Sequence, residues 1–290
     1  MPAKNSLPTV ALVALPLGNV QDLSARARST LESSDLIFCE DTRRLQDLAA
    51  RAHLALKAKL VSLPGDRERD MDWARFLPDY ATWALVSDAG TPIVNDPGAS
   101  LLTWAQGRGC HVSAIPGPSA PVLAWQWSGG FGLPYVFAGF APKAKRPEAK
   151  ELAEFFAPLS QARTFVYFDS RHQAVLTLQG LVALGRGESS MFIAREMTKP
   201  HEELLKGNVS SMLEWLQARV QQDEGIGELT LVMRGDGSAP ASTVSVDELA
   251  RLRSAPTKEA SKIMASLTGL TARECYDRLV KAQASGEDNE

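Results

Sequence analysis

Short, continuous apolar runs alternate with helical patterns through the first half of this chain, and this alternation constrains its fold more than any other feature. The runs occupy residues 9–15 (TVALVAL), 35–39 (DLIFC), 60–63 (LVSL), 83–87 (WALVS) and 112–115 (VSAI). A strand that is apolar throughout must be covered on both faces, and the segments between the runs have the spacing of helices that can cover it. The pattern therefore predicts an α/β fold with a parallel sheet.

A second set of apolar runs begins after the Gly- and Pro-rich residues 128–134 (SGGFGLP). We expect strands near 135–139, 163–168, 190–194 and 228–233, and helices near 148–157, 171–184 and 209–220. Residues 235–241 (GDGSAPA) have the composition of a linker, and the pattern beyond them is purely helical. The expected domains are an N-terminal α/β domain at 1–128, a second α/β domain at 129–238 and a helical extension at 239–290. An eight-fold barrel is the main alternative, but the mid-chain break and the helical tail favour two domains.

Composition excludes several classes of protein. Three Cys that lie far apart, and four His without metal-ligand spacing, argue against a disulfide framework and a metal site and fit a reducing cytoplasm. No apolar stretch has the length of a membrane span, and the N-terminus lacks the apolar core of a signal peptide, so we expect no membrane partner. The net charge is −3, so a polyanionic partner has to meet a local basic patch.

Four of the predicted strands end in loops that are richer in Gly, Pro and Asp than a simple turn requires. These loops are residues 15–19 (LPLGN), 39–44 (CEDTRR), 87–98 (SDAGTPIVNDPG) and 115–120 (IPGPSA). Each loop alone fits ordinary turn chemistry. Ligands of open α/β sheets bind beyond the carboxyl ends of the strands, so four such loops on one edge favour a binding site. The G-x-G-x-x-G and G-x-x-x-x-G-K-[ST] motifs are absent, which argues against a Rossmann enzyme, a P-loop enzyme and the common class of methyltransferases.

Together, in order, these loops resemble the tetrapyrrole methylase superfamily. The segments that carry the resemblance are residues 10–24, 39–43, 87–92, 95–98 and 116–120. Residues 139–143 (GFAPK) and 194–203 (AREMTKPHEE) resemble the branch that methylates a cytidine ribose 2′-hydroxyl in small-subunit (16S) ribosomal RNA. The resemblance covers about residues 9–235, and a helical tail of that branch matches the rest. The chain departs from the pattern at Leu15, at residues 62–68 and at residues 168–173.

The resemblance implies two α/β domains with the cofactor cleft between them, and a small C-terminal helical module. It implies S-adenosyl-L-methionine as the cofactor, ribosomal RNA or the small ribosomal subunit as the partner, and a homodimer. The cofactor-binding residues that it implies are Pro16, Leu17, Asp88, Ala89, Gly90, Thr91, Ser119, Ala120 and Phe168. The chemistry of two of them agrees, because Gly90 lets backbone approach a ligand and Asp88 can accept a hydrogen bond from its ammonium.

Methyl transfer from a sulfonium starts from an activated donor, so positioning can supply much of the acceleration. A ribose hydroxyl is weakly acidic, and a nearby base or cation would help it react. Asp41 is the candidate base, with Arg43 or Lys199 as the candidate stabiliser of the oxygen. Asp41 is equally well placed to cap a helix that begins at Thr42, so both roles remain open.

Two basic regions are candidates for contacts with RNA. Residues 143–150 (KAKRPEAK) contain Lys143, Lys145, Arg146 and Lys150, which fit phosphate binding or simply a solvated loop. In the tail, Ala260, Ile263, Met264 and Leu267 fall on one helical face. Residues 271–274 (TARE) have the capping-box pattern, with Leu270 placed to pack against Cys275. The polar faces carry Lys258, Lys262, Arg273, Arg278 and Lys281. A tail that grips RNA is one interpretation, and a helical cap over a sheet edge is the other.

The function expected from these observations is 2′-O-methylation of a cytidine ribose in small-subunit ribosomal RNA. Two alternatives remain from the sequence alone. One is a small-molecule methylase that acts on a tetrapyrrole of the precorrin type. The other is a non-catalytic RNA-binding assembly factor with the same fold.

Overall fold

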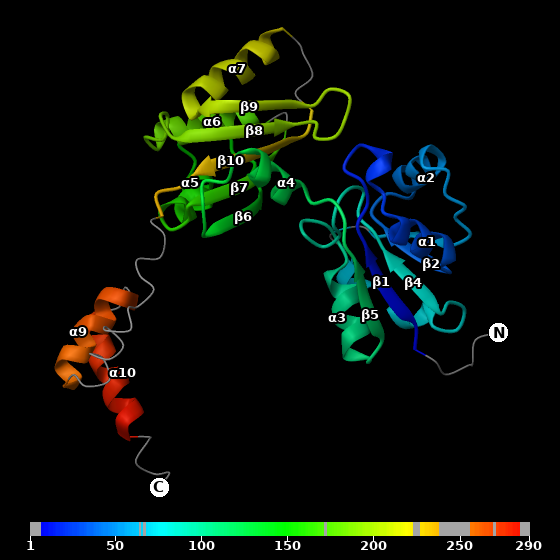
Figure 1. Ribbon diagram of the computed structural model, residues 1–290, viewed down its shortest axis with the longest axis horizontal. Coiled ribbons are helices and arrows are strands. Elements are labelled where there is room, and N and C mark those ends of the chain that lie inside the picture. Colours follow the sequence, from blue (N-terminus) through cyan, green and yellow to red (C-terminus); the bar gives the residue numbers. More distant parts are fainter. Residues whose placement is uncertain are drawn as a thin grey trace. The chain divides into compact units, whose positions relative to one another are not determined.

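The computed structural model describes residues 7–63, 65, 68–170, 173–222, 227–237, 256–268 and 271–284. The chain divides into two units, Met1–Asp236 and Gly237–Glu290. The described part of the first unit contains two five-stranded sheets with flanking helices (Figure 1). The expected α/β class with C-terminal helices is confirmed. No helix among the described residues is both long enough and apolar enough to cross a membrane.

The first sheet is parallel throughout, as the apolar runs predict. Its strands are β1 (Thr9–Val13), β2 (Leu36–Cys39), β3 (Lys59–Ser62), β4 (Thr82–Leu85) and β5 (His111–Ile115), in the order β3-β2-β4-β1-β5. The connections contain α1 (Ala25–Ser33), α2 (Thr42–Arg51), α3 (Ala99–Gly107) and the 3₁₀ turns η1 (Val20–Asp22), η2 (Glu68–Asp70) and η3 (Trp73–Phe76). Phe38 of β2 packs into one hydrophobic core, whereas its neighbours Ile37 and Cys39 pack into another. Both faces of the sheet are therefore buried, which explains why the strands do not alternate in polarity.

The second sheet is mixed rather than parallel. Its strands are β6 (Tyr135–Phe140), β7 (Thr164–Asp169), β8 (Ser190–Arg195), β9 (Glu203–Asn208) and β10 (Leu229–Arg234), in the order β6-β7-β10-β8-β9. Only β6 and β7 are parallel neighbours, and the other three pairs are antiparallel. The sequence pattern did not predict β9, because this edge strand is only partly buried and Leu204 on it is exposed.

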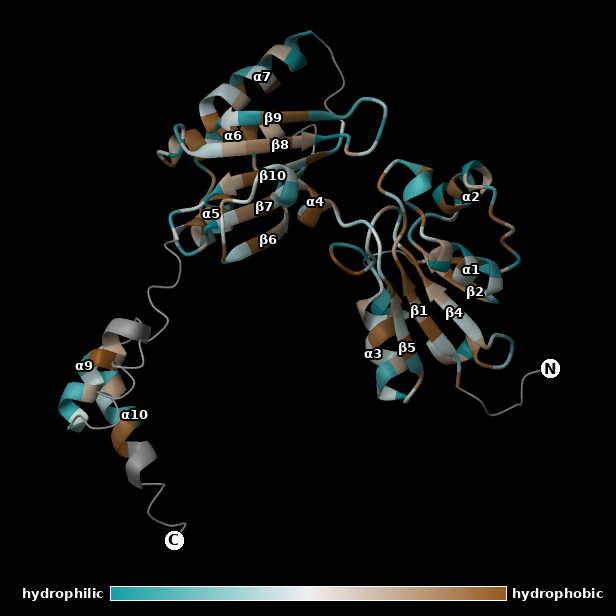
Figure 2. Cartoon of the chain, in the orientation of Figure 1, coloured by the Kyte–Doolittle hydropathy of each residue, from teal (hydrophilic) through white to brown (hydrophobic). Residues whose placement is uncertain are grey.

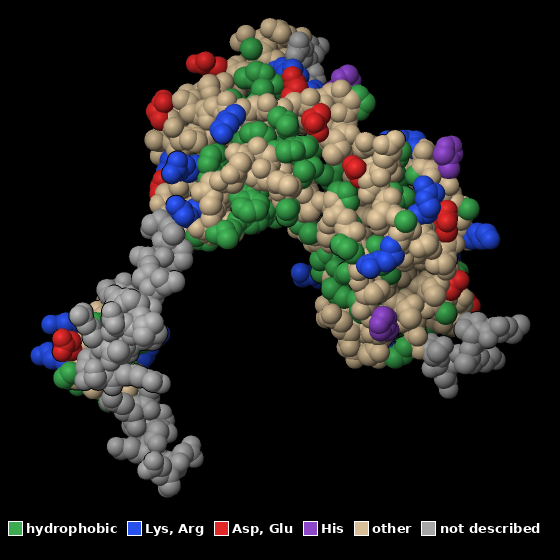
Figure 3. Space-filling model, in the orientation of Figure 1, with side chains coloured by type: hydrophobic (Ala, Val, Ile, Leu, Met, Phe, Trp, Pro, Cys, Tyr) green, Lys and Arg blue, Asp and Glu red, His purple; other side chains and the backbone are tan. Residues whose placement is uncertain are grey.

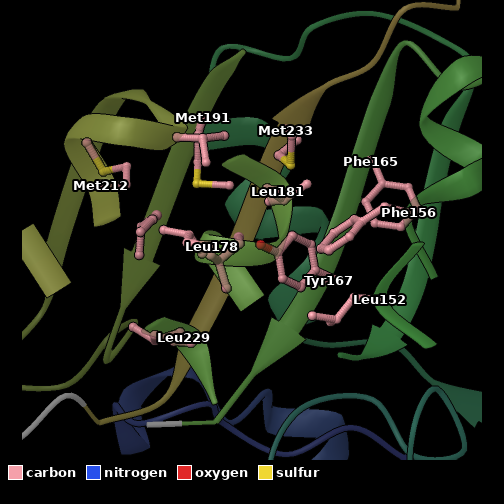
Figure 4. Close-up of a cluster of buried hydrophobic side chains, with 14 of the residues drawn as sticks. Leu152, Phe156, Phe165, Tyr167, Leu178, Leu181, Met191, Met212, Leu229 and Met233 are labelled. Carbon is pink, nitrogen blue, oxygen red and sulfur yellow. The ribbon is translucent and has the colours of Figure 1, made fainter. Parts of the chain in front are cut away.

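Each face of the second sheet is also covered. One face packs against α5 (Lys150–Phe156), the 3₁₀ turn η4 (Ala157–Ser160), α6 (Ala174–Ala183) and α7 (Val209–Gln221). Figure 4 shows this core, with Tyr167 and Phe165 of β7 beside Met191 of β8 and Met233 of β10. Figure 2 shows that the strands of both sheets carry many hydrophobic residues.

The helix α4 (Ala120–Trp127) covers the other face of the second sheet, against β7 and β10. Ala124 of this helix is fully buried among Val166, Phe192 and Val232. A segment that follows the last strand of the first sheet thus packs on the second sheet. The expected boundary at 128/129 stays a prediction, and this packing shows that α4 connects the two sheets.

The described part of the second unit consists of α9 (Thr257–Thr268) and α10 (Ala272–Ala284), which pack against each other. Ala260 and Cys275 are buried between them. The predicted capping box is confirmed, because the Thr271 N–H donates to Glu274 Oε2 at 2.8 Å and the Glu274 N–H donates to Thr271 Oγ1 at 3.3 Å. Leu270, and the side chains of Leu267 and Lys281, lie outside the described residues.

Glu68 is a buried carboxylate that caps α3 from a distant turn. The N-cap residue of α3 is Gly98, with φ of 130°, and it offers no side chain to the helix. Instead, the N–H groups of Gly98 and Ser100 donate to the Glu68 carboxylate at 2.8 and 2.5 Å, and that of Leu101 at 3.4 Å. Burial raises the pKa of Glu68, but these hydrogen bonds outweigh burial, and the net pKa lies below its ordinary value. Glu68 thereby anchors the end of the 87–98 loop.

We expect Glu68→Gln to destabilise the first unit by about 1–3 kcal/mol at neutral pH, because Gln directs a donor or a weaker acceptor at three backbone N–H groups. The depressed pKa means that the contribution of Glu68 is complete above its unfolded-state pKa, about 4.5, and is lost as the pH falls through the lower folded-state value. Urea unfolding followed by tryptophan fluorescence at pH 7 and pH 3.5 measures both effects. Asp70→Asn, on the same turn but exposed, is the matched control. An equal loss of stability at both pH values would contradict the capping role.

Candidate functional site

The loops at the carboxyl edge of the first sheet are joined by backbone hydrogen bonds. The Leu15 N–H donates to the Gly90 carbonyl at 2.8 Å, and the Gly90 N–H donates to the Leu15 carbonyl at 3.0 Å. Gly90 adopts a φ of +71°, in the left-handed region that favours glycine. The Thr91 hydroxyl donates to the Pro118 carbonyl at 3.0 Å, which adds the loop after β5. The loops predicted to form a site are therefore held at one edge.

These loops open onto a pocket of about 280 Å³ that also includes residues of the second sheet. We call it the acid-lined pocket, after its carboxylates, which are Glu40, Asp88, Asp96, Asp169 and Glu228. Eight of the nine expected cofactor-binding residues line it, namely Leu17, Asp88, Ala89, Gly90, Thr91, Ser119, Ala120 and Phe168. The ninth, Pro16, lines a neighbouring pocket. The structure brings these residues together, and their individual contacts with a cofactor stay predictions.

The lining of the acid-lined pocket suits S-adenosylmethionine. Its lining contains five carboxylates and one cation, Arg44, and Glu228 also pairs with Lys199 outside the lining. The excess of carboxylates favours a ligand that carries an ammonium and a sulfonium. Its apolar lining includes Leu17, Val94 and Met197. Phe168 adds an aromatic cluster, with its ring 5.0 Å from that of Phe137 and 5.2 Å from that of Phe140. Apolar and aromatic surfaces of this kind suit an adenosine group. Among the described residues, no His, Cys, Asp and Glu side chains gather in a group that could hold a metal ion.

Crowding of carboxylates changes their protonation. Burial raises the pKa of Glu40, the negative charges of Asp88 and Asp96 raise it further, and Arg44 partly opposes them. Burial also raises the pKa of Asp96, with a smaller contribution from Asp88. Burial raises the pKa of Asp169 to about 6, against hydrogen bonds from Thr177 and Ser170. A bound cation would relieve this repulsion and favour the ionised carboxylates.

Asp88 is already engaged on both oxygens. Its Oδ1 accepts from the Asp41 N–H at 3.0 Å, and its Oδ2 pairs with Arg44 Nη1 at 3.1 Å. The carboxylate therefore connects the loop after β4 to the start of α2. The side chain of Cys39, at the end of β2, is buried. Burial, followed by the charges of Asp88 and Asp41, raises the pKa of the Cys39 thiol to about 12.

Asp41 caps α2, which was one of its two expected roles. Its Oδ1 accepts from the Arg43 N–H at 2.8 Å, and the Arg43 guanidinium binds the carboxylate through Nε at 3.1 Å and Nη2 at 2.7 Å. These bonds from Arg43 lower the pKa of Asp41 to about 2. Asp41 and Arg43 line a separate pocket with Pro16, Gly18 and Arg51, called here the α2 pocket. Their catalytic roles stay predictions, and a carboxylate held in this way is a weak base.

Lys199 lies outside the lining of both pockets and joins the loops of the two sheets. Its ammonium pairs with Glu228 Oε2 at 2.8 Å and Glu196 Oε1 at 3.2 Å. Burial lowers the pKa of Lys199, but the two ion pairs outweigh burial, and the net pKa is raised. A Cβ at Gly18 would collide with Lys199 Cγ, and the Asn19 N–H donates to Thr198 Oγ1 at 3.2 Å. These contacts favour a positioning role for Lys199, because Glu228 lines the acid-lined pocket.

The candidate RNA contacts of the first unit lie on an exposed segment. Lys143, Lys145, Arg146 and Lys150 are all exposed, and Lys150 pairs with Glu154 at 3.2 Å. Neither the phosphate-binding nor the solvated-loop interpretation is tested by this placement. Glu40, Arg44 and Asp96 also line the acid-lined pocket but were not predicted as site residues, although all three lie in the loops predicted to form a site.

Comparisons with known proteins were consistent with each other. A family model described as "Tetrapyrrole (Corrin/Porphyrin) Methylases" matches residues 9–213. A Mycobacterium tuberculosis protein named "Ribosomal RNA small subunit methyltransferase I" is 32% identical over 283 residues, or 94% of each chain. A Thermotoga maritima protein of the same name is 33% identical over 226 residues, which cover 77% of this chain and 97% of that one.

Solved structures show the same fold at lower identity. A diphthine synthase has a TM-score of 0.57 at 13% identity, over 78% of this chain and 89% of that chain. A uroporphyrin-III C-methyltransferase from Thermus thermophilus, complexed with S-adenosylhomocysteine, has a TM-score of 0.52 at 13% identity, over 78% and 97% of the two chains. At 13% identity, these two structures show a shared fold and nothing more specific.

We expect Asp88→Ala to weaken S-adenosylmethionine binding by about 1.5–3 kcal/mol, or roughly 10- to 150-fold in Kd, through loss of a hydrogen bond between charged groups. Asp88→Asn separates charge from structure, because its amide oxygen can still accept from the Asp41 N–H. It should weaken binding nearly as much as Ala. Calorimetry with a chelator present measures the affinity, and Asp79→Asn, exposed and outside both pockets, is the control. Wild-type affinity in both Asp88 variants would show that this carboxylate does not hold the ligand.

Proposed function

The chain belongs to the tetrapyrrole (corrin/porphyrin) methylase family, and we propose from this that it is an S-adenosylmethionine-dependent methyltransferase acting on the 2′-hydroxyl of a cytidine ribose in small-subunit ribosomal RNA. One observation carries the proposal. The 32% identity to a relative named as a small-subunit ribosomal RNA methyltransferase extends over 94% of both chains, so it includes the C-terminal tail as well as the sheets.

The acid-lined pocket supports the choice of donor. S-adenosylmethionine supplies an activated methyl group on a sulfonium. The Asp88 carboxylate can accept a hydrogen bond from the ammonium of this donor. Gly90 has no side chain, so the donor can approach the backbone closely there. Phe168 and Met197 offer apolar surface to the adenosine. The resulting role of the chain is to orient the donor and to exclude water from one side of it.

We propose Glu40, rather than Asp41, as the group that takes the proton of the acceptor hydroxyl. Glu40 lines the acid-lined pocket, and its pKa is raised, which makes it a better base than an ordinary carboxylate. Asp41 has a pKa of about 2 and is bound by Arg43. We assign to Asp41 the positioning of α2, and to Lys199 the positioning of Glu228.

We expect Glu40→Gln to reduce kcat by about 10²–10⁴-fold, the usual effect of losing a general base, with little change in donor affinity. Asp41→Asn should reduce kcat far less, because Asn also caps helices well. Glu40 acts when deprotonated, so wild-type kcat should rise with pH through a pKa above the ordinary 4.5, and this limb should disappear in Glu40→Gln. Transfer of tritiated methyl groups to small-subunit ribosomal RNA measures kcat and its dependence on pH. A large loss in Asp41→Asn with a small one in Glu40→Gln would assign the base to Asp41 instead.

The second unit supports an RNA acceptor. Three cations, Lys258, Lys262 and Arg273, line one hollow of about 500 Å³ between α9 and α10, with Tyr276 beside them. Its described lining contains no carboxylate. Lys and Arg side chains are accordingly visible on this unit in Figure 3. A cationic hollow of this kind suits phosphates, and a tetrapyrrole acceptor would not require it.

We expect replacement of Lys258, Lys262 and Arg273 together by Gln to weaken RNA binding and to reduce the slope of log affinity against log salt by about 2–3, because three phosphates lose a partner. Donor affinity should not change. Filter binding at several salt concentrations measures the slope. Replacement of the exposed Lys57, Arg69 and Arg75 by Gln removes the same charge from the first unit and serves as the control. Equal effects of the two triple variants would mean that only net charge matters.

Mapping of ribose methylation in ribosomal RNA from a deletion strain tests the proposed function as a whole. Loss of one 2′-O-methylcytidine from small-subunit RNA is expected, with restoration by the wild-type gene but not by Glu40→Gln. An unchanged map with methylation of a tetrapyrrole by the purified protein would support the precorrin-type alternative. RNA binding without any methyl transfer would support an assembly factor. The cytoplasmic location and the homodimer that accompany this function remain part of the proposal.

A further inference from the structure

The α2 pocket adjoins the acid-lined pocket, because Leu17, Arg44 and Asp88 line both. The α2 pocket has a volume of about 490 Å³ and the acid-lined pocket about 280 Å³. A transfer reaction requires two reactants in contact, and two pockets with shared lining residues allow that contact. If the acid-lined pocket holds the donor, the α2 pocket is an adjoining place for the acceptor.

The α2 pocket offers three guanidinium groups to an anion, each of them paired with a carboxylate of the same lining. The pairs are Arg43–Asp41, Arg44–Asp88 and Arg51–Asp47. Arg44, Asp47, Leu48 and Arg51 are spaced at i, i+3, i+4 and i+7, so one face of α2 lines the pocket. Arg43 adds a third guanidinium from the first turn. The side chains of Arg43, Arg44 and Arg51 are 87%, 66% and 54% exposed, so a large polyanion can reach them. Guanidinium groups match the geometry of phosphate, and exposed Arg–Asp pairs such as Arg51–Asp47 are weak enough to be exchanged for it.

Arg44 connects the two pockets through its ion pair with Asp88. Asp88 is only 16% exposed, and it is the carboxylate that we assign to the ammonium of the donor. An ammonium at Asp88 would place two cations against one carboxylate, and their repulsion would favour release of Arg44. The Arg44 side chain is long and largely exposed, so it can turn into the α2 pocket while α2 stays in place.

We propose that the α2 pocket binds the phosphate beside the acceptor ribose, and that Arg44 moves from Asp88 to this phosphate when Asp88 holds the ammonium of the donor. The inference rests on the proposed function and adds to it a phosphate subsite and a coupling between the substrates. Because the coupling is thermodynamic, donor binding tightens RNA binding, and RNA binding tightens donor binding by the same factor.

The test measures binding of small-subunit ribosomal RNA with and without saturating S-adenosylhomocysteine, which carries the ammonium but has no methyl group to transfer. Wild type should bind RNA about 5-fold more tightly, or more, with S-adenosylhomocysteine present, at the lower end of known couplings. Arg44→Gln should abolish this factor, so that its RNA affinity is the same with and without S-adenosylhomocysteine. Arg51→Gln, which is not bound to Asp88, should weaken RNA binding in both conditions. Arg75→Gln, outside both pockets, should keep the full coupling.

Affinity for S-adenosylhomocysteine decides between two roles of Arg44. If Arg44 competes with the donor ammonium for Asp88, Arg44→Gln should bind S-adenosylhomocysteine as tightly as wild type or more tightly. Such binding also shows that the variant is folded. Weaker binding would make Arg44 a ligand of the donor and would overturn the inference. RNA binding and methylation by wild type without any coupling would overturn the inference alone. Failure of wild type to bind or methylate ribosomal RNA would remove the proposed function and the inference with it.

Discussion

The two hydrogen bonds between Leu15 and Gly90 are the constraint on which the site depends. They join the loop after β1 to the loop after β4, and the buried Leu15 side chain fixes the pair to the core of the first sheet. Gly90 has a φ of +71°, and a Cβ there would lie 3.1 Å from Leu17 Cδ2, so a side chain at this position would strain the backbone and crowd Leu17. Asp88 is held two residues away, where it meets Asp41 and Arg44. Repelling carboxylates can be kept together here because the core, and not their own interaction, determines their positions.

The first sheet could be predicted because burial on both faces leaves a clear mark on the sequence. Ile37 and Phe38 face different cores, so neither position tolerates a polar residue. The second sheet is different. Antiparallel and parallel neighbours can have equally apolar sequences, so the pattern located β7, β8 and β10 without their directions. Strand β9 was missed because an edge strand with exposed Leu204 lacks a continuous apolar run. The packing of α4 on the second sheet depends on tertiary contacts that the sequence pattern does not contain.

For the candidate site, residue types could be predicted but their partners could not. The loops predicted to form a site contain Asp88 and Gly90. Leu15, where the chain departs from the family pattern, is a buried core residue. Another departure contains Glu68, whose role at α3 depends on contacts with residues about 30 positions later in the chain. The sequence left Asp41 between capping and catalysis, and the difference depends on the Arg43 side chain, which turns back onto it. The pKa of Glu40, by contrast, is raised by burial and by Asp88 and Asp96, which lie in the loop after another strand, so the sequence around Glu40 does not indicate it.

The thiol of Cys39 gives this arrangement a further consequence. A methyl sulfonium alkylates any good nucleophile within reach, and a thiolate is a far better nucleophile than a ribose hydroxyl. Cys39 immediately precedes Glu40 of the acid-lined pocket, but its side chain lies in the core of the first sheet, where the thiol donates to the Val61 carbonyl at 3.8 Å. Burial, followed by the charges of Asp88 and Asp41, raises the pKa of this thiol to about 12 and keeps the sulfur neutral at pH 7. The buried strand end therefore keeps a reactive sulfur both neutral and inside the core, which, under the proposed function, would protect the chain from alkylation by its own donor.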